Sequence, residues 1–82
     1  MSDGDSIVNI AGYRFINIKN RDKLRQSFRD ITEKLGLKGT ILLSPNGINF
    51  VLAGTQKAIN DYISYLDKDE RFQDIPIHIS YT

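Results

Sequence analysis

The sequence LGLKGTILLSPNGINFVLAG, residues 35–54, combines the end of a helix, two strands and the turn that joins them. Its two short apolar runs, residues 39–44 and 48–53, have the length and composition typical of strands. The turn between them is either type I′, with Asn46 and Gly47 at its centre, or type I, with Pro45 at its second position. Both alternatives predict a β-hairpin, and they differ in its register.

Upstream of this hairpin, residues 21–35 form a predicted helix. Its apolar side chains recur at helical spacing on one stripe, which consists of Leu24, Phe28, Ile31 and Leu35. Asn20 offers a side-chain oxygen as N-cap, and Gly36 is well placed as the left-handed residue that ends the helix. Residues 7–18 precede the helix and are apolar on both faces, which predicts a central strand.

Downstream of the hairpin, Thr55 is the predicted N-cap of a second helix. The apolar stripe of this helix consists of Ile59, Tyr62, Ile63 and Leu66. A charged segment, residues 67–74, follows it. Alternating apolar and polar residues at positions 75–80 then predict a half-exposed fourth strand. Because Pro76 cannot donate a hydrogen bond to a neighbouring strand, this strand belongs at a sheet edge.

The predicted order of elements is therefore βαββαβ. Right-handed crossovers around a central hairpin favour an α+β, ferredoxin-like fold, in which a four-stranded antiparallel sheet carries both helices on one face. The first and third strands are then central, and the helices supply Leu24, Phe28, Ile31, Leu35, Ile59, Ile63 and Leu66 to the core. Four aromatic residues fall on predicted strands, and we expect them mostly in the core, with some possible on the open sheet face: Tyr13, Phe15, Phe50 and Tyr81.

The composition of this chain of 82 residues excludes several functions. Without cysteine it has no disulfide, thiolate metal site or cysteine nucleophile, and one histidine cannot form a histidine-cluster zinc site. The net charge is +1, with eight basic against five acidic side chains in residues 1–41. We expect a cytoplasmic monomer without metal, cofactor or membrane span, in which the small, polar residues 1–6 form a disordered head.

The hairpin also supplies candidate binding residues. Asn46 and Gly47 are the residue types that a tight turn requires. Asn49 is an amide in an otherwise apolar strand, so we expect it to find a partner in the neighbouring loop, a ligand or an adjoining domain. On the first helix, the row Arg21, Arg25 and Arg29 permits phosphate contact, although solvated head groups on stems packed along the core edge are the simpler interpretation.

Several stretches together resemble a known family. They are residues 7–15 (IVNIAGYRF), 35–43 (LGLKGTILL), 47–49 (GIN) and the pair Arg71-Phe72. Their order and spacing are similar to those of the N-terminal, acylphosphatase-like domain of the rhodanese-related tRNA uridine-34 hydroxylases, over nearly the whole chain after residue 6. The family's turn usually reads EGINGT, whereas residues 46–51 read NGINFV. The resemblance therefore extends to Gly47 and Asn49 but not to the acid or the second glycine.

This resemblance implies that residues 7–82 are one domain of a longer protein. Family members continue into a rhodanese domain with an essential loop cysteine, and they add the 5-hydroxyl group to the wobble uridine of tRNA. A chain without cysteine cannot contain that centre, so the resemblance implies a non-catalytic accessory domain that packs on the rhodanese domain and helps to position the anticodon arm. Its candidate contact residues are Arg14, Lys38, Asn46, Gly47 and Asn49.

Two other functions are compatible with the same fold. An independent RNA-recognition module binds single-stranded RNA with aromatic residues on its central strands, and its third-strand pattern is met here only at Gly47, Phe50 and Val51. Exposure of Phe50 on the sheet would favour this alternative. Acylphosphatases are the other possibility, but residues 15–20 lack the glycine-rich loop that holds phosphate in those enzymes, so the resemblance implies their fold and not their activity.

Overall fold

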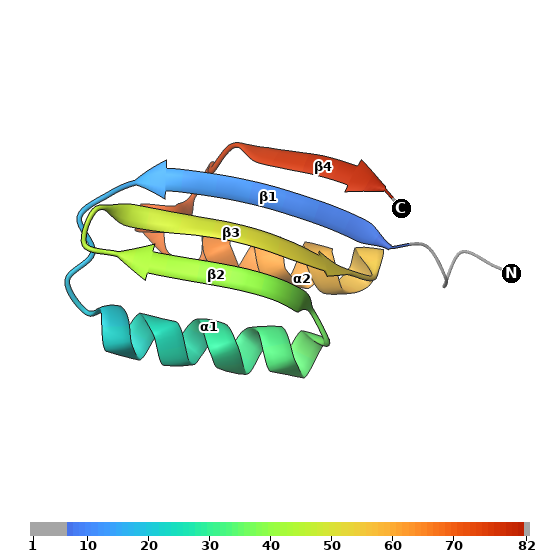
Figure 1. The fold of residues 1–82 in the computed structure, drawn as a ribbon, viewed down its shortest axis with the longest axis horizontal. Coiled ribbons are helices and arrows are strands. Elements are labelled where there is room, and N and C mark those ends of the chain that lie inside the picture. Colours follow the sequence, from blue (N-terminus) through green and yellow to red (C-terminus); the bar gives the residue numbers. More distant parts are fainter. Residues whose placement is uncertain (1–6, 82) are drawn as a thin grey trace, which may run out of the picture.

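The computed structural model describes residues 7–81, which form one sheet and two long helices (Figure 1). The predicted disordered head, residues 1–6, lies outside the described residues. In chain order the elements are β1 (Val8–Phe15), α1 (Arg21–Leu35), β2 (Lys38–Ser44), β3 (Gly47–Gly54), α2 (Gln56–Asp67), the short 3₁₀ helix η2 (Glu70–Phe72) and β4 (Ile77–Tyr81).

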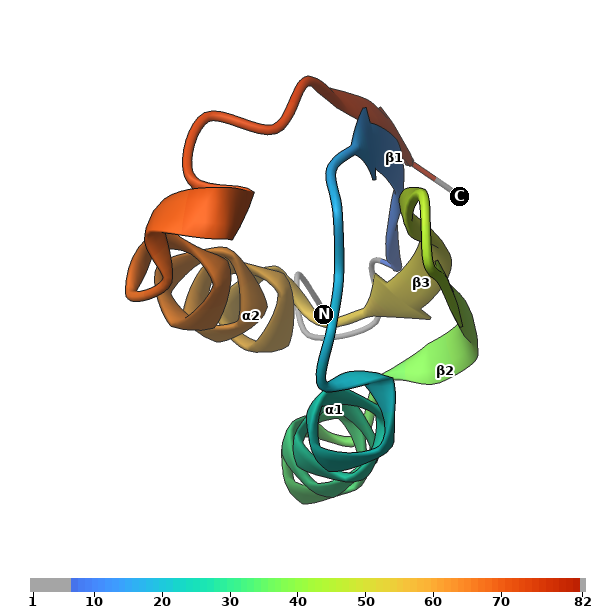
Figure 2. The same ribbon diagram turned by 90° about the vertical axis from the view of Figure 1, so that its left-hand side faces the viewer.

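The four strands form one antiparallel sheet in the order β2-β3-β1-β4. Both helices lie on the same side of this sheet, as the end-on view shows (Figure 2). The predicted ferredoxin-like α+β fold is therefore confirmed, with β1 and β3 in the centre and β2 and β4 at the edges. In the central pair Gly12 lies opposite Phe50 and Tyr13 opposite Asn49, and this register determines which side chains face the helices.

The helix ends confirm two of the three predicted caps. Gly36 adopts the left-handed conformation with φ 70° and ends α1, while the Thr55 hydroxyl accepts a hydrogen bond from the Ala58 amide at the start of α2. Asn20 occupies the N-cap position of α1, as predicted, but the expected capping role of its side-chain oxygen is wrong, because this side chain makes no capping hydrogen bond. Its Oδ1 instead accepts a hydrogen bond from the Arg71 guanidinium, 51 residues away in the sequence.

Two strands are shorter than the sequence predicted. β1 ends at Phe15, because the amides of Ile16 and Ile18 donate to the carbonyl oxygens of Asn46 and Pro45 at the hairpin turn. The fourth strand begins at Ile77 instead of residue 75. Before it the backbone turns sharply at Asp74, whose φ of 58° is left-handed.

The hairpin turn follows the type I alternative, with Pro45 in its first central position. Ser44 pairs with Gly47, so Pro45 and Asn46 are the two central residues. The type I′ alternative is wrong, because it requires a positive φ at both central residues and Asn46 has none. Gly47 is needed for close approach, since a Cβ atom there would collide with the carbonyl oxygen of Arg14 on β1.

The core lies between the sheet and the helices. Phe28, Ile59 and Leu66 are buried as predicted, whereas the other predicted helix residues pack against the core and are partly buried: Leu24, Ile31, Leu35 and Ile63. Segments outside the regular elements also contribute to the core, through Ile18, Phe72 and Ile75. Phe50 points inward over Gly12, where a Cβ atom would lie 2.6 Å from the ring.

Tyr62 lies at the centre of this core, and its hydroxyl oxygen makes no hydrogen bond within the described residues. Its ring contacts those of Phe28 and Phe50, and the hydroxyl itself is buried. Burial raises the pKa of this phenol well above its ordinary value.

Replacing Tyr62 by phenylalanine is therefore expected to stabilise the protein. The change removes the unpaired hydroxyl, whose burial costs about 1–3 kcal/mol, and keeps the ring contacts. Urea unfolding followed by circular dichroism measures the free energy of unfolding, which we expect to rise by about 1 kcal/mol. A fall of the same size would contradict this assignment and show that the hydroxyl has a partner.

Candidate functional site

The sheet face opposite the helices carries an uncovered apolar surface. Strands alternate their side chains, so the residues next to inward-facing Ile10, Gly12 and Phe50 point to this open face. Four of its side chains are large and apolar, and we call them the open-face patch: Tyr13, Phe15, Leu42 and Val51. Their exposed fractions are 61%, 81%, 62% and 57%. Such contiguous apolar exposure is typical of an interaction surface.

Three of the four strand aromatics are exposed, which corrects the expectation that most of them lie in the core. Tyr13 and Phe15 are exposed, and their rings contact each other edge to face with centroids 5.5 Å apart. Tyr81 is also exposed, at the end of the edge strand β4. Phe50 alone is buried, at 1% exposure. The RNA-recognition alternative needs an aromatic ring on the third strand that an RNA base can contact. β3 offers no such ring, because Phe50 is buried.

Two shallow hollows in the open face meet at Tyr13 and Asn49, which line both. One, of about 320 Å³, lies beside the hairpin and is also lined by Phe15, Leu42, Ser44, Asn46 and Gly47. The other, of about 430 Å³, extends towards β4 and is also lined by Ala11, Pro76, Ile77 and His78. The Asn49 side chain is exposed and has no hydrogen-bond partner among residues 7–81. Its amide is therefore available to a ligand or an adjoining domain.

The predicted contact residues do not form one cluster. Asn46, Gly47 and Asn49 lie together at the hairpin. Arg14 lines the same hollow, but it is paired with buried Ile48, so its side chain points to the helix side of the sheet. One guanidinium nitrogen of Arg14 donates to the Asp74 carbonyl oxygen at 2.9 Å, so the side chain also holds the left-handed turn before β4. Lys38 begins β2 at its opposite end. The six residue steps to Ser44 place it roughly 20 Å from the turn.

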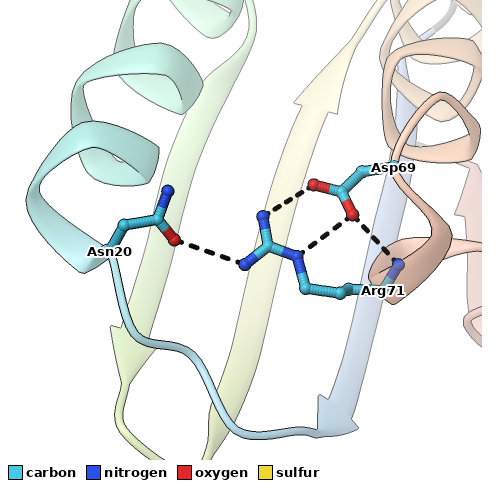
Figure 3. Close-up of polar contacts among 3 residues, drawn as sticks. All are labelled: Asn20, Asp69 and Arg71. Atoms are coloured by element: carbon cyan, nitrogen blue, oxygen red, sulfur yellow. Dashed lines mark hydrogen bonds and ion pairs between the residues drawn. The ribbon is translucent and has the colours of Figure 1, made fainter.

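A polar network ties the start of α1 to the segment after α2 (Figure 3). The Arg71 guanidinium donates twice to the Asp69 carboxylate, at 2.7 and 3.1 Å, and once to Asn20 Oδ1 at 3.3 Å. These hydrogen bonds lower the pKa of Asp69. The guanidinium also lies over the Phe72 ring, 5.2 Å from its centroid. The network is structural, because it holds the first turn of α1 against η2 and supports the buried Phe72.

Residues 7–81 contain no group of three or more histidine, aspartate or glutamate side chains that could hold a metal ion. Neither of the long helices in this part of the chain has the length and hydropathy needed to cross a membrane.

The open-face patch was not predicted from the sequence pattern. The signal was present in β3, where buried Ile48, Phe50 and Leu52 alternate with outward residues. In β1, apolar residues occupy both odd and even positions, so the alternation between inward and outward side chains could not be recognised from the sequence. Leu42 was likewise part of a continuous apolar run in β2, in which no polar residue marked the outer face.

Comparisons with known proteins identify similar chains. A family model described as the UPF0176 acylphosphatase like domain matches residues 7–82. A tRNA uridine(34) hydroxylase from Bordetella avium is 47% identical over 75 residues, which are 92% of this chain and 31% of the relative. The tRNA uridine(34) hydroxylase from Cupriavidus taiwanensis is 48% identical over 69 residues, 84% of this chain and 24% of the relative.

The chain thus spans between a quarter and a third of the length of these relatives. Among solved structures, one described as BlrP1 BLUF superimposes with a TM-score of 0.68 at 20% sequence identity, covering 94% of this chain and 54% of that one. A likeness at this level of identity supports the fold alone.

Proposed function

The chain belongs to the UPF0176 acylphosphatase-like domain family, and on that premise we propose that it is the non-catalytic accessory domain of a cytoplasmic tRNA uridine(34) hydroxylase. In this proposal the domain packs on the rhodanese domain of the longer protein and helps to position the anticodon arm of the tRNA. The cysteine chemistry of the family then belongs to the neighbouring domain, since this chain has no cysteine.

The open-face patch is the observation that carries the proposal. An isolated small domain gains nothing from exposing two aromatic rings and two aliphatic side chains side by side, because their burial is favourable. The matched relatives are about three to three and a half times as long as this chain, so they contain the chain length to cover the patch. We therefore assign Tyr13, Phe15, Leu42 and Val51 to the contact with the rest of the protein.

The hairpin is the part of this surface best suited to RNA. Asn46 and Asn49 offer amide groups there, whereas the Arg14 guanidinium lies on the other side of the sheet, where it donates to the Asp74 carbonyl oxygen. Lys38 lies at the far end of β2, so it would contact a phosphate several nucleotides from any that the hairpin contacts. Base-specific modification requires an unstacked anticodon base, and in this proposal the hairpin lies beside the active site and holds the loop backbone.

Titration with an anticodon stem-loop RNA tests the RNA contact. We expect weak binding by the chain of residues 1–82, with amide shifts at Arg14, Lys38, Asn46, Gly47 and Asn49. Binding should weaken steeply with salt, because neutralised phosphates release counterions. The substitution Lys38→Gln should weaken binding, whereas Lys57→Gln should not, since Lys57 lies on α2 and is paired with Asp61.

Two results would contradict this assignment. Amide shifts that are absent at low salt would assign all RNA contact to the rest of the protein. Shifts centred on the acidic residues 67–74 would show that the hairpin and its basic neighbours are structural.

A further inference from the structure

One side of α1 carries three arginines at regular intervals, and none of the contacts described above uses them. Arg25 and Arg29 line the hollow between α1 and β2, and helical spacing places Arg21 on the same side one turn earlier. We call these three residues the arginine row. Four residues of helix rise about 6 Å, so the three side chains leave the helix at intervals of about 6 Å.

Positive charge is concentrated around this row. Residues 19–29 carry five basic side chains and one acidic side chain, whereas the rest of the chain carries six basic and nine acidic ones. The two further cations, Lys19 and Lys23, line a hollow at the start of α1 together with Arg21. The small net charge of the chain therefore combines one strongly basic segment with an acidic remainder.

The cations of this segment are almost without ion-pair partners. Arg25 Nη1 lies 3.8 Å from Asp22 Oδ1, and both side chains of this pair are largely exposed, so the pair contributes little. The other four cations of residues 19–29 form no ion pair within residues 7–81. Cations gathered without counterions repel one another, and a bound polyanion relieves this repulsion.

The basic segment lies at the same end of the sheet as the hairpin turn (Figure 1). The amides of Ile16 and Ile18 donate to the carbonyl oxygens at the turn, and Lys19 follows directly. The hairpin residues 44–49 have no basic side chain of their own, and the Arg14 guanidinium is bonded to the Asp74 carbonyl. The arginine row is thus the source of positive charge next to the hairpin.

The row fits an RNA backbone better than a membrane or an acidic peptide. RNA carries one phosphate per nucleotide at regular intervals, and a guanidinium group can form two hydrogen bonds to one phosphate. None of the large apolar side chains that are exposed among residues 7–81 lies on α1, so the row has no apolar anchor for a membrane beside it. The apolar floor of the hollow between α1 and β2 already packs in or against the core. The row therefore offers charge and spacing, which are what phosphate contacts require.

We propose that the arginine row is the phosphate-binding surface of this domain and contacts successive phosphates of the anticodon arm. The hairpin holds the loop of the same RNA, and Lys19 and Lys23 add to the attraction at the start of α1. This inference rests on the proposed RNA contact and identifies the residues that supply most of its affinity.

The test is binding of an anticodon stem-loop RNA by the triple variant Arg21→Gln/Arg25→Gln/Arg29→Gln. We expect binding at low salt to weaken at least tenfold. The slope of log affinity against log salt should become less steep by about 2, because each phosphate contact with a single strand contributes about 0.7. The matched control Lys34→Gln/Lys57→Gln/Lys68→Gln removes three charges elsewhere and should weaken binding less than threefold. Circular dichroism verifies that both variants fold.

Two further measurements separate charge from structure. In the unmodified chain, the Nε–Hε resonances of the three arginines should shift when RNA is added, and this readout requires no variant. The variant Arg21→Lys/Arg25→Lys/Arg29→Lys keeps the charges and should bind within about threefold of the unmodified chain. If it binds as weakly as the glutamine variant, the loss does not follow the charge and the proposal is overturned.

The outcomes distinguish this inference from the proposed function. Shifts of the hairpin amides, with equal binding by the glutamine variant and the unmodified chain, would overturn the arginine row and leave the hairpin contact in place. Absence of binding at low salt would overturn the RNA contact as a whole, and the row with it. If polyglutamate of equal charge bound as tightly as the RNA, with the same loss in the glutamine variant, the row would be assigned to an acidic protein instead.

Discussion

Replacing Phe28 by alanine is expected to lower the free energy of unfolding by about 3–5 kcal/mol. Phe28 is 2% exposed and is the residue through which α1 joins the rest of the core. Its ring contacts Tyr62, Tyr65 and Phe72, so the truncation leaves a cavity between α1, α2 and η2 and removes three aromatic contacts. Small domains have a total stability of about 5–15 kcal/mol, so this loss leaves a marginally folded chain.

The chain offers a matched control for this change. The control is the substitution of Phe15 by alanine. Phe15 lies on the open face and is 81% exposed. Phe15→Ala should alter the free energy of unfolding by no more than about 0.5 kcal/mol in urea titrations. Equal destabilisation by the two substitutions would contradict the assignment of Phe28 to the core and Phe15 to the surface.

The second large effect concerns the open-face patch in a full-length protein. In a chimaera, residues 7–81 replace the matching segment of the Bordetella avium relative. We expect the double variant Tyr13→Ser/Phe15→Ser of this chimaera to hydroxylate tRNA at least about tenfold more slowly. Truncation of aromatic side chains at the centre of an interface costs about 1–2 kcal/mol each or more, and about 1.4 kcal/mol corresponds to a factor of ten.

The product is measured as the mass gain of one oxygen atom in the tRNA fragment that contains uridine 34. Ile79→Ser/Tyr81→Ser is the control. These exposed residues pair with Ile10 and Val8, so their side chains point to the helix side of the sheet and not to the open face. Equal activity of the patch variant and the unmodified chimaera would show that the patch does not contribute to the function of the full-length protein.

The fold could be predicted because its main signals are local. The turn residues at 45–47, the left-handed Gly36 and the helical stripe around Phe28 each act within a few residues. The features that were predicted wrongly, the capping bond of Asn20 and the end of the first strand, depend on distant partners. Asn20 lies 51 residues from Arg71, and β1 stops where Ile16 and Ile18 bond to the hairpin turn. No local pattern indicates such contacts.

The candidate site could be predicted only in part for a related reason. Asn46 and Gly47 follow from turn chemistry, and Asn49 was identified as an amide in an otherwise apolar strand. Which face of β1 looks away from the helices depends on the close packing of Phe50 over Gly12, which is a tertiary contact. Arg14 could be identified as basic, but not as the residue that holds the Asp74 carbonyl, 60 residues away.

Hydroxyl-radical footprinting of Tyr13 and Phe15 tests the central claim that the open-face patch is buried in the full-length protein. Both side chains are largely exposed in this chain, at 61% and 81%, so they should oxidise readily when residues 1–82 are treated alone. In the chimaera, with oxidation normalised to Tyr65 on the helix side, their oxidation should fall several-fold. Unchanged oxidation of both rings in the chimaera would contradict the account, because the patch would then be exposed in the full-length protein as well.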